Sequence, residues 1–564
     1  MHDLVIRGAT VVDGTGAPAR TADVAVDGDR IAAVEPGVGI GRREIDADGL
    51  LLTPGWVDIH THYDGQVSWD PELSPSSWHG VTTVVMGNCG VGFAPVRPGA
   101  EDFLIELMEG VEDIPGTALH EGIDWQWESF DGYLSFVERT PRTMDVVAQV
   151  PHAALRAYVM GERAHDEATP DDMAAMADLT AQALEAGAAG FTTSRTILHR
   201  SKHGFVPGTS AAPDELRAIG EGLRRAGHGV FQLVSDNGAR EPERAWMVDI
   251  ARRTGATVTY ALAQEPWAPA GYRDALADAA ALADEGLRIV PQVSCRPTGM
   301  LFGLQSSLHP FITHPTCAGL ARLPLPERVA QLRRPEVRSA LLAEEPGTSD
   351  PIALALMSRW DQMFPLGDPP DYEPAPSTSV AAVAAATGRT PQEVVLDWLL
   401  ERDGTALIFA PLASYVDTDH EALREMMTHP TTVLGLSDGG AHCGLICDAS
   451  MPTFLLTHWV RDRARGPRLP LEQVVHLQTG RTASVYGLTD RGVVAPGKRA
   501  DLNLVDLDNL TLHAPEMVFD LPAGGRRLVQ HVDGYRATVV AGEVTFEDGK
   551  PTGARPGGLV RMGR

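Results

Sequence analysis

The middle of the chain repeats one pattern, in which a short apolar run rich in β-branched residues is followed by a stretch with helical periodicity. The apolar runs lie at 51–59, 80–88, 144–150, 189–196, 228–235, 256–262, 288–295, 406–412 and 431–440. The helical stretches include 169–187, 214–227, 240–255 and 272–286. Strands that are apolar throughout pair in parallel with helices outside them. Their number, near eight, predicts an α/β fold, a TIM-like (β/α)8 barrel with its chemistry at the strand carboxyl ends.

The two ends of the chain have a different β character. Residues 1–52 alternate apolar and polar side chains and carry a hairpin signal at Asp27-Gly28. The same alternation returns within 481–564. We therefore expect one small β-sandwich built from both termini around a barrel at 53–480, although two separate β-caps remain an alternative. Residues 300–375 are irregular and rich in proline and glycine, which predicts an insertion that forms a lid or substrate wall.

Composition excludes some classes of partner. The 564 residues carry a net charge of −28, which argues against binding to nucleic acid or to an anionic membrane surface. We find neither a signal sequence nor an apolar run long enough to span a bilayer. Five cysteines are too few and too unevenly spaced for a disulfide framework, so we expect a reducing, cytoplasmic location.

Two histidines end the first run of the middle region. In 51–66, LLTPGWVDIHTHYDGQ, His60 and His62 are two residues apart. Side chains alternate along a strand, so both imidazoles point the same way and supply half of a metal site. The alternative is a pair of polar residues where a strand leaves the core.

Two later segments supply further ligand types at strand ends. Cys89 lies between glycines in GNCG, and a thiolate is a good zinc ligand, although a buried structural cysteine is the alternative. Asp438 in LSDGG ends the last run, and a carboxylate there can bind metal and accept a proton from water. It can instead cap a turn. His442 follows closely and is a candidate to line the same opening.

Four stretches together identify a family resemblance. They are GATVVDGTG with LLTPGWVDIHTHYDGQ, then GVTTVVMGNCG, LSDGG and RGVVAPGKRADLNLVD. The chain resembles the amidohydrolase superfamily, and within it the N-acyl-D-amino-acid deacylase (D-aminoacylase) branch. The resemblance implies a metal-bearing barrel that hydrolyses an amide-type bond with metal-activated water. It implies one or two zinc ions, or another divalent metal, on His60, His62 and Cys89, with Asp438 as base and possible ligand.

The sequence departs from that family at two barrel strands. The family usually ends its fifth and sixth strands in a metal-binding histidine, and an ungapped placement puts Val234 and Leu262 there. The lysine that meets the substrate carboxylate in the family is replaced by Gln264. Two completions of the site stay open: a single metal on His60, His62 and Asp438 with Cys89, or a new ligand from 189–209.

The segment 189–209 and its neighbours also supply candidate substrate contacts. His199 and Lys202 follow the fourth strand, and a carbamylated Lys202 would be able to bridge metals, although a solvated basic loop is the alternative. Arg195, Arg296 or Lys202 are candidates to bind a substrate carboxylate. Tyr63 or Asn88 are candidates to hold the developing oxyanion.

The leading hypothesis is a metal-dependent hydrolase that cleaves a C–N bond of a small acylated or cyclic amide. One alternative is a barrel enzyme with an absent or atypical metal site that performs lyase, isomerase or other acid–base chemistry. Another is a binding protein without catalysis. A small-molecule substrate is the expected partner, and a homo-oligomer is plausible for this architecture.

Overall fold

Two parallel sheets carry the repeating middle of the chain in the computed structural model, which describes residues 1–236, 238 and 240–563. One has the order β6-β7-β8 and the other the order β19-β15-β14-β13-β10-β9. Their strands are β6 (Trp56–Asp58), β7 (Val81–Met86), β8 (Asp145–Ala148), β9 (Val150–Pro151), β10 (Gly190–Arg195), β13 (Val230–Ser235), β14 (Thr257–Ala261), β15 (Ile289–Val293) and β19 (Val433–Leu434). The predicted α/β class is confirmed.

The two sheets follow each other along the chain and also meet at their far ends. Only Gln149 separates β8 from β9, and its backbone N–H donates to Met86 of β7. At the other end, Thr61 after β6 forms a parallel bridge with Gly439 after β19. These contacts bring the carboxyl ends of the first and last parallel strands together.

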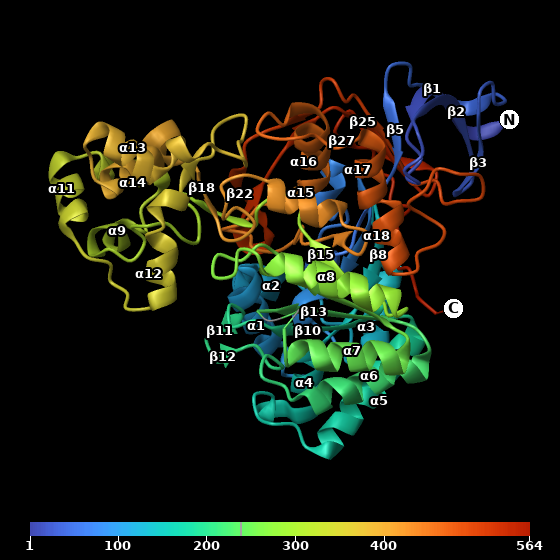
Figure 1. Cartoon of the computed structure of the whole chain (residues 1–564), viewed down its shortest axis with the longest axis horizontal. Helices are drawn as coiled ribbons and strands as arrows, with labels where there is room; N and C mark the ends of the chain where they lie inside the picture. The colour runs from blue at the N-terminus through green and yellow to red at the C-terminus, as the bar shows by residue number, and fades with distance from the viewer. Residues whose placement is uncertain (237, 239, 564) are drawn as a thin grey trace.

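Helices connect the parallel strands, and their ends lie within three residues of the predicted bounds. They are α5 (Pro170–Ala186), α6 (Pro213–Ala226), α7 (Glu243–Thr254) and α8 (Gly271–Asp284), and Figure 1 shows them packed side by side over the lower body. In α5, Thr169 caps the first turn by accepting from the Asp172 N–H, and the Asp172 side chain accepts in return from the Thr169 N–H. Gly187 ends the helix in the left-handed conformation.

Strands from both ends of the chain share one nine-stranded sheet within the described residues. It holds β1 (His2–Val11), β2 (Arg20–Asp27), β3 (Arg30–Glu35), β4 (Gly41–Asp46), β5 (Leu51–Pro54), β20 (Leu502–Val505), β25 (Tyr535–Val540), β26 (Glu543–Glu547) and β27 (Lys550–Pro551). β5 joins the two halves, because it pairs with β1 on one side and β20 on the other. The apolar run 51–59 is therefore divided: β5 belongs to this sheet and β6 to the parallel set.

The inserted segment is longer than predicted. β16 (Gly299–Phe302) pairs antiparallel with β18 (Ile408–Pro411), which also pairs with β17 (Phe364–Pro365). The helices are α9 (Pro315–Leu320), α10 (Leu325–Leu332), α11 (Pro335–Ala343), α12 (Pro351–Met357), α13 (Val380–Thr387) and α14 (Pro391–Leu400), which form the lobe at the left of Figure 1. The prediction that 406–412 is another strand of the parallel set is wrong, because an apolar run does not specify its partner strand.

The remaining helices and strands lie outside these sheets. They are α1 (Glu101–Glu112), α2 (Gly116–Gly122), α3 (Phe130–Arg139), α4 (His152–Met160), α15 (Glu421–Thr428), α16 (Met451–Phe454), the π-helix η8 (Leu455–Asp462), α17 (Leu471–Gln478), α18 (Gly480–Val485), β11 (Arg200–Ser201), β12 (Gly204–Phe205), β21 (Thr511–Leu512), β22 (Glu516–Leu521), β23 (Gly525–Val529) and β24 (Val532–Asp533). No helix of the described part of the chain has both the length and the apolar character needed to cross a membrane.

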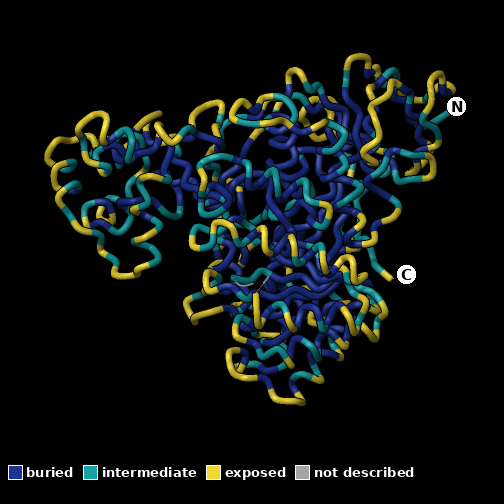
Figure 2. The backbone as a smooth tube through the Cα atoms, viewed as in Figure 1, coloured by how far each residue is buried: buried dark blue, intermediate teal, exposed yellow. Residues whose placement is uncertain are grey.

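Burial is concentrated in the central body, as Figure 2 shows. Every residue of β7 is buried, which agrees with a strand covered on both faces. The inserted lobe has an apolar core of its own that includes Phe302, Leu332 and Leu399. α13 and α14 pack into this core, so the helical stretch that follows residue 375 also belongs to the lobe. The site described next lies at the carboxyl ends of the parallel strands.

Candidate metal centre

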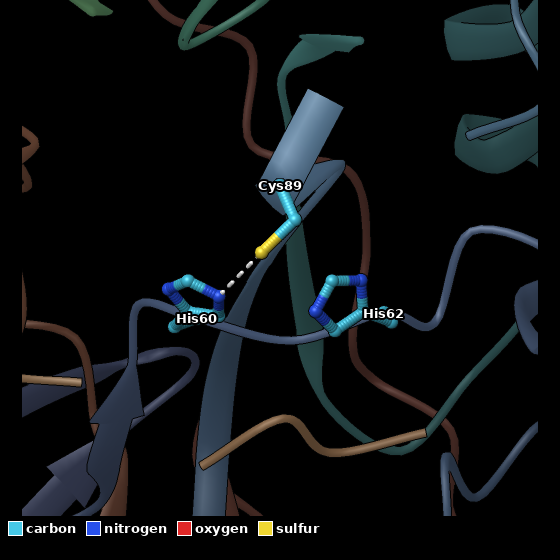
Figure 3. A group of neighbouring side chains, drawn as sticks. All are labelled: His60, His62 and Cys89. Atoms are coloured by element: carbon cyan, nitrogen blue, oxygen red, sulfur yellow. Dashed lines mark hydrogen bonds between the residues drawn. The ribbon is translucent and has the colours of Figure 1, made fainter. Parts of the chain in front are cut away.

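His60 and His62 follow β6 and project into one buried space. Both side chains are 1% exposed, and their ring centroids are 5.6 Å apart. Backbone hydrogen bonds hold this segment in place. The Thr61 N–H donates to the Val85 carbonyl, and the His62 N–H donates to the Gly439 carbonyl. Figure 3 shows both rings turned toward Cys89.

Cys89 reaches the histidines from a tight turn after β7. His60 Nε2 lies 3.3 Å from Cys89 Sγ, and ligand atoms of His60, His62 and Cys89 all lie within 4.8 Å of one another. The flanking glycines are required: a Cβ on Gly87 would lie 2.5 Å from the Gln149 carbonyl, and one on Gly90 would lie 2.7 Å from a backbone nitrogen of β10. Close packing of this turn therefore directs the thiol inward.

Asp438 arrives at the same point from the segment after β19. Its Oδ1 lies 3.3 Å from His60 Nε2 and 3.6 Å from His62 Nε2. Its backbone N–H donates to the His60 carbonyl, and the neighbouring Ser437 hydroxyl donates to Asp58. The ends of β6 and β19 are thus tied together, and the tie holds the carboxylate beside both imidazoles.

The donor set fits a transition metal. Among the described residues, neither ring nitrogen of His62 has a hydrogen-bond partner, although the side chain is buried. Both carboxylate oxygens of Glu112, at the end of α1, are likewise buried without a hydrogen bond. Buried polar atoms are rarely left without a partner. Imidazole, thiolate and carboxylate are the ligands that zinc takes in proteins.

Burial and neighbouring charges shift the pKa values of the side chains in this cluster in different directions. Burial lowers the pKa of His60 to about 4, which leaves the ring neutral and able to donate a lone pair. Burial alone would raise the pKa of Asp438, but the rings of His62, His60 and His442 hold it below its ordinary value. Burial likewise opposes the charge on His62, whose pKa is nevertheless raised by Glu112 and Asp438.

Three further groups surround the ligands, and sequence reasoning missed two of them, Gln292 and Glu112. Gln292 Oε1 on β15 lies 2.8 Å from His60 Nδ1, and Gln232 Oε1 on β13 accepts from the Cys89 N–H. Glu112 Oε1 lies 3.3 Å from His62 Nδ1. A single glutamine within each buried apolar strand was the available signal for Gln292 and Gln232. The sequence offered no comparable signal for Glu112, because it ends a helix that only the fold brings to the site.

Neither strand that lacks a histidine supplies a replacement at the expected position. Gln232 pairs with Thr259 across β13 and β14, so Val234 stands level with Ala261 rather than Leu262. By strand alternation Val234 and Ala261 share the inward face, and Leu262 does not. Valine and alanine bind no metal, so the ligands come from elsewhere.

Two predicted oxyanion donors are engaged in internal bonds. Both amide hydrogens of Asn88 donate to backbone carbonyls, one of them that of Thr61, and its oxygen accepts from Gln149. The Tyr63 hydroxyl donates to Ser76 at 2.7 Å, and the Tyr63 ring is fully buried. The structure therefore does not support the oxyanion role predicted for either residue.

The cations predicted to bind a substrate carboxylate are paired within the protein. Arg195 forms a two-point pair with Glu243 at 2.8 and 2.9 Å. Lys202 is exposed and pairs with Glu106, so it does not reach the cluster as a bridging ligand. These partners neutralise both side chains, which does not favour the predicted contact of either with a substrate carboxylate.

Arg296 is buried beside the centre but is also paired. It donates to Asp448 Oδ1 at 2.8 and 3.1 Å, and its guanidinium lies 4.1 Å from the Tyr372 ring centroid. Its Nη1 has no hydrogen-bond partner among the described residues. Its charge is balanced by Asp448, which does not favour the predicted contact with a substrate carboxylate.

His199 and His442 line the approach to the ligands. His442 Nε2 lies 3.5 Å from Glu112 Oε2 and 3.8 Å from Asp438 Oδ2, and its side chain is 20% exposed. His199 Nδ1 lies 3.0 Å from the Ser194 hydroxyl. Burial, together with the charges of His442 and the metal-centre histidines, lowers the pKa of His199 to about 3. Both candidate contacts therefore lie near the cluster.

Comparison with known proteins shows which family the chain belongs to. The sequence model of the amidohydrolase family matches residues 43–546. The N-acyl-D-aspartate deacylase of Alcaligenes xylosoxydans xylosoxydans is 30% identical over all of this chain and 95% of its own length. The D-aminoacylase of the same organism is 27% identical over 89% of this chain and 88% of its own.

Solved structures agree in fold. A D-aminoacylase crystal structure aligns over 100% of both chains with a TM-score of 0.64 and 24% identity. The N-acyl-D-glutamate deacylase of Bordetella bronchiseptica, solved with zinc and a phosphonate inhibitor, covers 99% of both chains with a TM-score of 0.65 and 24% identity. The resemblance predicted from the sequence motifs is confirmed. The chain belongs to the amidohydrolase family and is a hydrolase of carbon–nitrogen bonds other than peptide bonds.

Proposed function

We propose that this protein is a zinc-dependent deacylase that hydrolyses the amide bond of a small N-acylated amino acid. The observation that carries the proposal is the approach of His60, His62, Cys89 and Asp438 to one buried point. The orphaned nitrogens of His62 support it, because they are explained if one of them faces a cation.

These four side chains are the proposed ligands, with Gln292 and Glu112 as positioning residues. His60 donates its Nδ1 proton to Gln292, so the Nε2 lone pair faces Cys89 and Asp438. Glu112 Oε1 lies 3.3 Å from His62 Nδ1 without a hydrogen bond, so it is proposed to orient the second ring through its charge. A zinc ion held there would supply Lewis acidity toward the scissile carbonyl and toward a water molecule.

Asp438 is the proposed base. Its Oδ2 faces the side of His442, away from the ligand nitrogens that Oδ1 approaches. The carboxylate accepts a proton from the attacking water as the C–O bond forms. It then gives that proton to the nitrogen as the C–N bond breaks, so the products are a carboxylic acid and an amine. His442 and His199 are proposed to contact the substrate, since both lie near this carboxylate.

The relatives suggest the substrates to test first. Two of them are named as deacylases of N-acyl-D-aspartate and N-acyl-D-glutamate, and a third as a D-aminoacylase. Gln264, which replaces the family lysine, donates to Asp417 and accepts from the Val416 N–H. A different carboxylate contact is therefore expected, and the substrate range of this chain need not follow that of its relatives.

We also propose the architecture that the strand pairings support. The eight strand positions from β6 to β19, with β8 and β9 as one, close into a (β/α)8 barrel through Thr61 and Gly439. We assign the nine-stranded sheet to the predicted small β-sandwich domain, 1–52 and 481–564, and the inserted lobe to the predicted barrel domain, 53–480. Five free buried cysteines support a reducing compartment such as the cytoplasm. A homo-oligomer stays a prediction.

One alternative function is supported by a specific observation. The inward positions of β13 and β14 are Val234 and Ala261, so the metal ligands of those strands are missing. A barrel without metal would then perform lyase or isomerase chemistry. Turnover that survives complete removal of metal would favour this alternative.

The test is release of free amine from a substrate panel. The panel contains N-acetyl-D-aspartate, N-acetyl-D-glutamate, neutral N-acetyl-D-amino acids, the matching L-forms and a cyclic amide. We expect amine release from at least one acylated amino acid, and loss of that release in His62→Ala with Gln264→Leu as the control. Ring opening of the cyclic amide alone would overturn the substrate class, and turnover unchanged in His62→Ala would overturn the mechanism.

A further inference from the structure

We infer that Glu373, His420 and His458 form a second metal site, separate from the centre at His60, that binds a divalent transition metal such as zinc. The three side chains are buried together, with exposed fractions of 3%, 0% and 16%. Their ligand atoms all lie within 4.8 Å of one another. None of them belongs to the proposed catalytic machinery.

The three residues come from different parts of the chain. Glu373 lies in the inserted segment between β17 and α13, and His420 immediately precedes α15. His458 lies on the π-helix η8. π-Helical turns are rare and occur often at functional sites. The site would therefore connect the inserted segment to two helices of the body.

The separations lie within about 0.2 Å of those in a tetrahedral zinc site. His420 Nδ1 lies 3.2 Å from His458 Nε2, and Glu373 Oε2 lies 3.1 Å from His458 Nε2 and 3.7 Å from His420 Nδ1. Ligand atoms at ~2.0–2.2 Å from a tetrahedral ion lie about 3.3–3.6 Å from one another. Two imidazoles and one carboxylate are a ligand set found in zinc sites that keep one open position.

The surroundings orient His420 as a ligand. Its Nε2 lies 2.9 Å from the Tyr372 carbonyl oxygen, which can only accept, so Nε2 carries the proton. The Nδ1 lone pair then points at the other two side chains. Burial lowers the pKa of His420 to about 3, so the ring is neutral at physiological pH. A second hydrogen bond of this kind is characteristic of metal-binding histidines.

Glu373 is also held in place and ionised. Its Oε1 accepts from the His420 N–H at 2.9 Å and from Arg463 at 3.0 Å, and Oε2 accepts from Arg463 at 3.1 Å. Burial would raise the pKa of Glu373, but the hydrogen bonds from His458 and Arg463 keep it below its ordinary value. Because each carboxylate oxygen has two lone pairs, Oε2 keeps one for the cluster.

The charge of Arg463 does not exclude a cation. Arg463 also donates to Glu421 at 2.9 Å and lies 4.6 Å from the Trp459 ring centroid. Glu421 also accepts from Arg424 at 2.8 Å, so two carboxylates balance two guanidinium groups and leave no net positive charge beside the two imidazoles. The competing arrangement places a proton on His458 Nε2, which then faces the acceptors His420 Nδ1 and Glu373 Oε2.

Metal content of the purified protein separates the two arrangements. We compare the wild type with His458→Ala, with Glu421→Gln, and with His62→Ala, each after dialysis in excess zinc and then in metal-free buffer. We expect His458→Ala to lose one equivalent of zinc and to keep amide hydrolysis, while Glu421→Gln keeps the wild-type content. His62→Ala is expected to lose zinc at the catalytic centre alone. The two variants therefore distinguish a wrong assignment of the catalytic centre from a wrong assignment of the second site.

A measurement on the wild type does not depend on folding of the variants. Crystals of the zinc-loaded protein, measured on both sides of the zinc absorption edge, are expected to give an anomalous peak between His420 Nδ1, His458 Nε2 and Glu373 Oε2. A proton-bridged cluster, with no peak there and equal zinc content in wild type and His458→Ala, would overturn the inference. A peak at the catalytic centre alone would overturn it as well.

Discussion

His60 Nε2 lies 3.3 Å from Asp438 Oδ1, although the two residues follow the first and the last strands of the parallel set. Backbone bonds enforce this proximity, since the Asp438 N–H donates to the His60 carbonyl and the His62 N–H donates to Gly439. The proposed metal centre is thus part of the closure between the first and last strands, and its geometry depends on that closure.

The glutamine behind His60 is expected to control metal affinity. Gln292→Leu removes the acceptor at 2.8 Å from His60 Nδ1, which frees the ring to turn and to exchange its tautomer. We expect the zinc affinity to fall about 10- to 100-fold. Competition with a coloured chelator measures it. Gln292→Glu keeps an acceptor and should stay within a few-fold of the wild type, and equal affinities for all three proteins would remove this role.

The segment after β19 carries backbone strain. Leu436, Asp438 and His442 all have positive φ, with 52° at His442. Glycine adopts that conformation without penalty. The free energy of unfolding of His442→Gly should therefore exceed that of His442→Ala by about 1 kcal/mol, and His442→Gly should unfold at the higher temperature. His429, with φ of −69°, is the matched control, where glycine should be the less stable variant. The reverse order at His442 would show that its backbone is unstrained.

A buried ion pair holds the carboxyl-terminal region against β8. Asp145 Oδ2 lies 2.6 Å from Arg491 Nη1 and 2.9 Å from Arg499 Nε, and its Oδ1 accepts from the Gly558 N–H. Asp145→Ala leaves two buried guanidinium groups without this partner, so we expect a loss of about 3–5 kcal/mol in unfolding free energy. Denaturant titration measures it. Asp490→Ala, at a half-exposed partner of Arg491, should cost less than about 1 kcal/mol.

Stability is expected to fall in mild acid because of a buried neutral histidine. His79 is fully buried between Thr453 and the Gln530 carbonyl, and burial lowers its pKa to about 3. The unfolded chain has a pKa of about 6.5, so it binds the proton first and stability is lost as the pH falls from 6.5 toward 3. The slope contributed is up to about 1.4 kcal/mol per pH unit.

His79→Gln tests this slope, because its amide can still donate to the Gln530 carbonyl. Unfolding titrations between pH 7.5 and 4.5 should give a flatter dependence for His79→Gln than for the wild type. His120→Gln, at an exposed histidine, should follow the wild type. Parallel curves for wild type and His79→Gln would mean that His79 takes no part.

The sequence predicted the parts of the site that sit at strand ends. His60 and His62 alternate on one strand, and Asp438 ends another, so parallel pairing alone brings them to one edge. Glu112 was not predictable in this way. It is the last residue of α1, and only the packing of that helix brings it to the site. Gln292 was missed because a buried glutamine is not distinctive until its oxygen is seen beside His60.

The inserted lobe shows a second limit of sequence reasoning. Residues 408–411 have the composition of a parallel strand, yet they pair antiparallel with Gly299–Phe302. α13 and α14 follow the predicted insertion in the sequence but also pack into the core of the lobe. Periodicity gives the type of an element and not its neighbours, so the insertion had to be underestimated at 300–375.

The proposed chemistry depends on one cation held between His60, His62, Cys89 and Asp438. Anomalous diffraction at the zinc absorption edge tests it most directly, on crystals of active protein. We predict a peak at ~2.0–2.3 Å from His60 Nε2, His62 Nε2, Cys89 Sγ and Asp438 Oδ1. A hydrolytically active crystal with no peak among these four atoms would contradict the proposed metal centre.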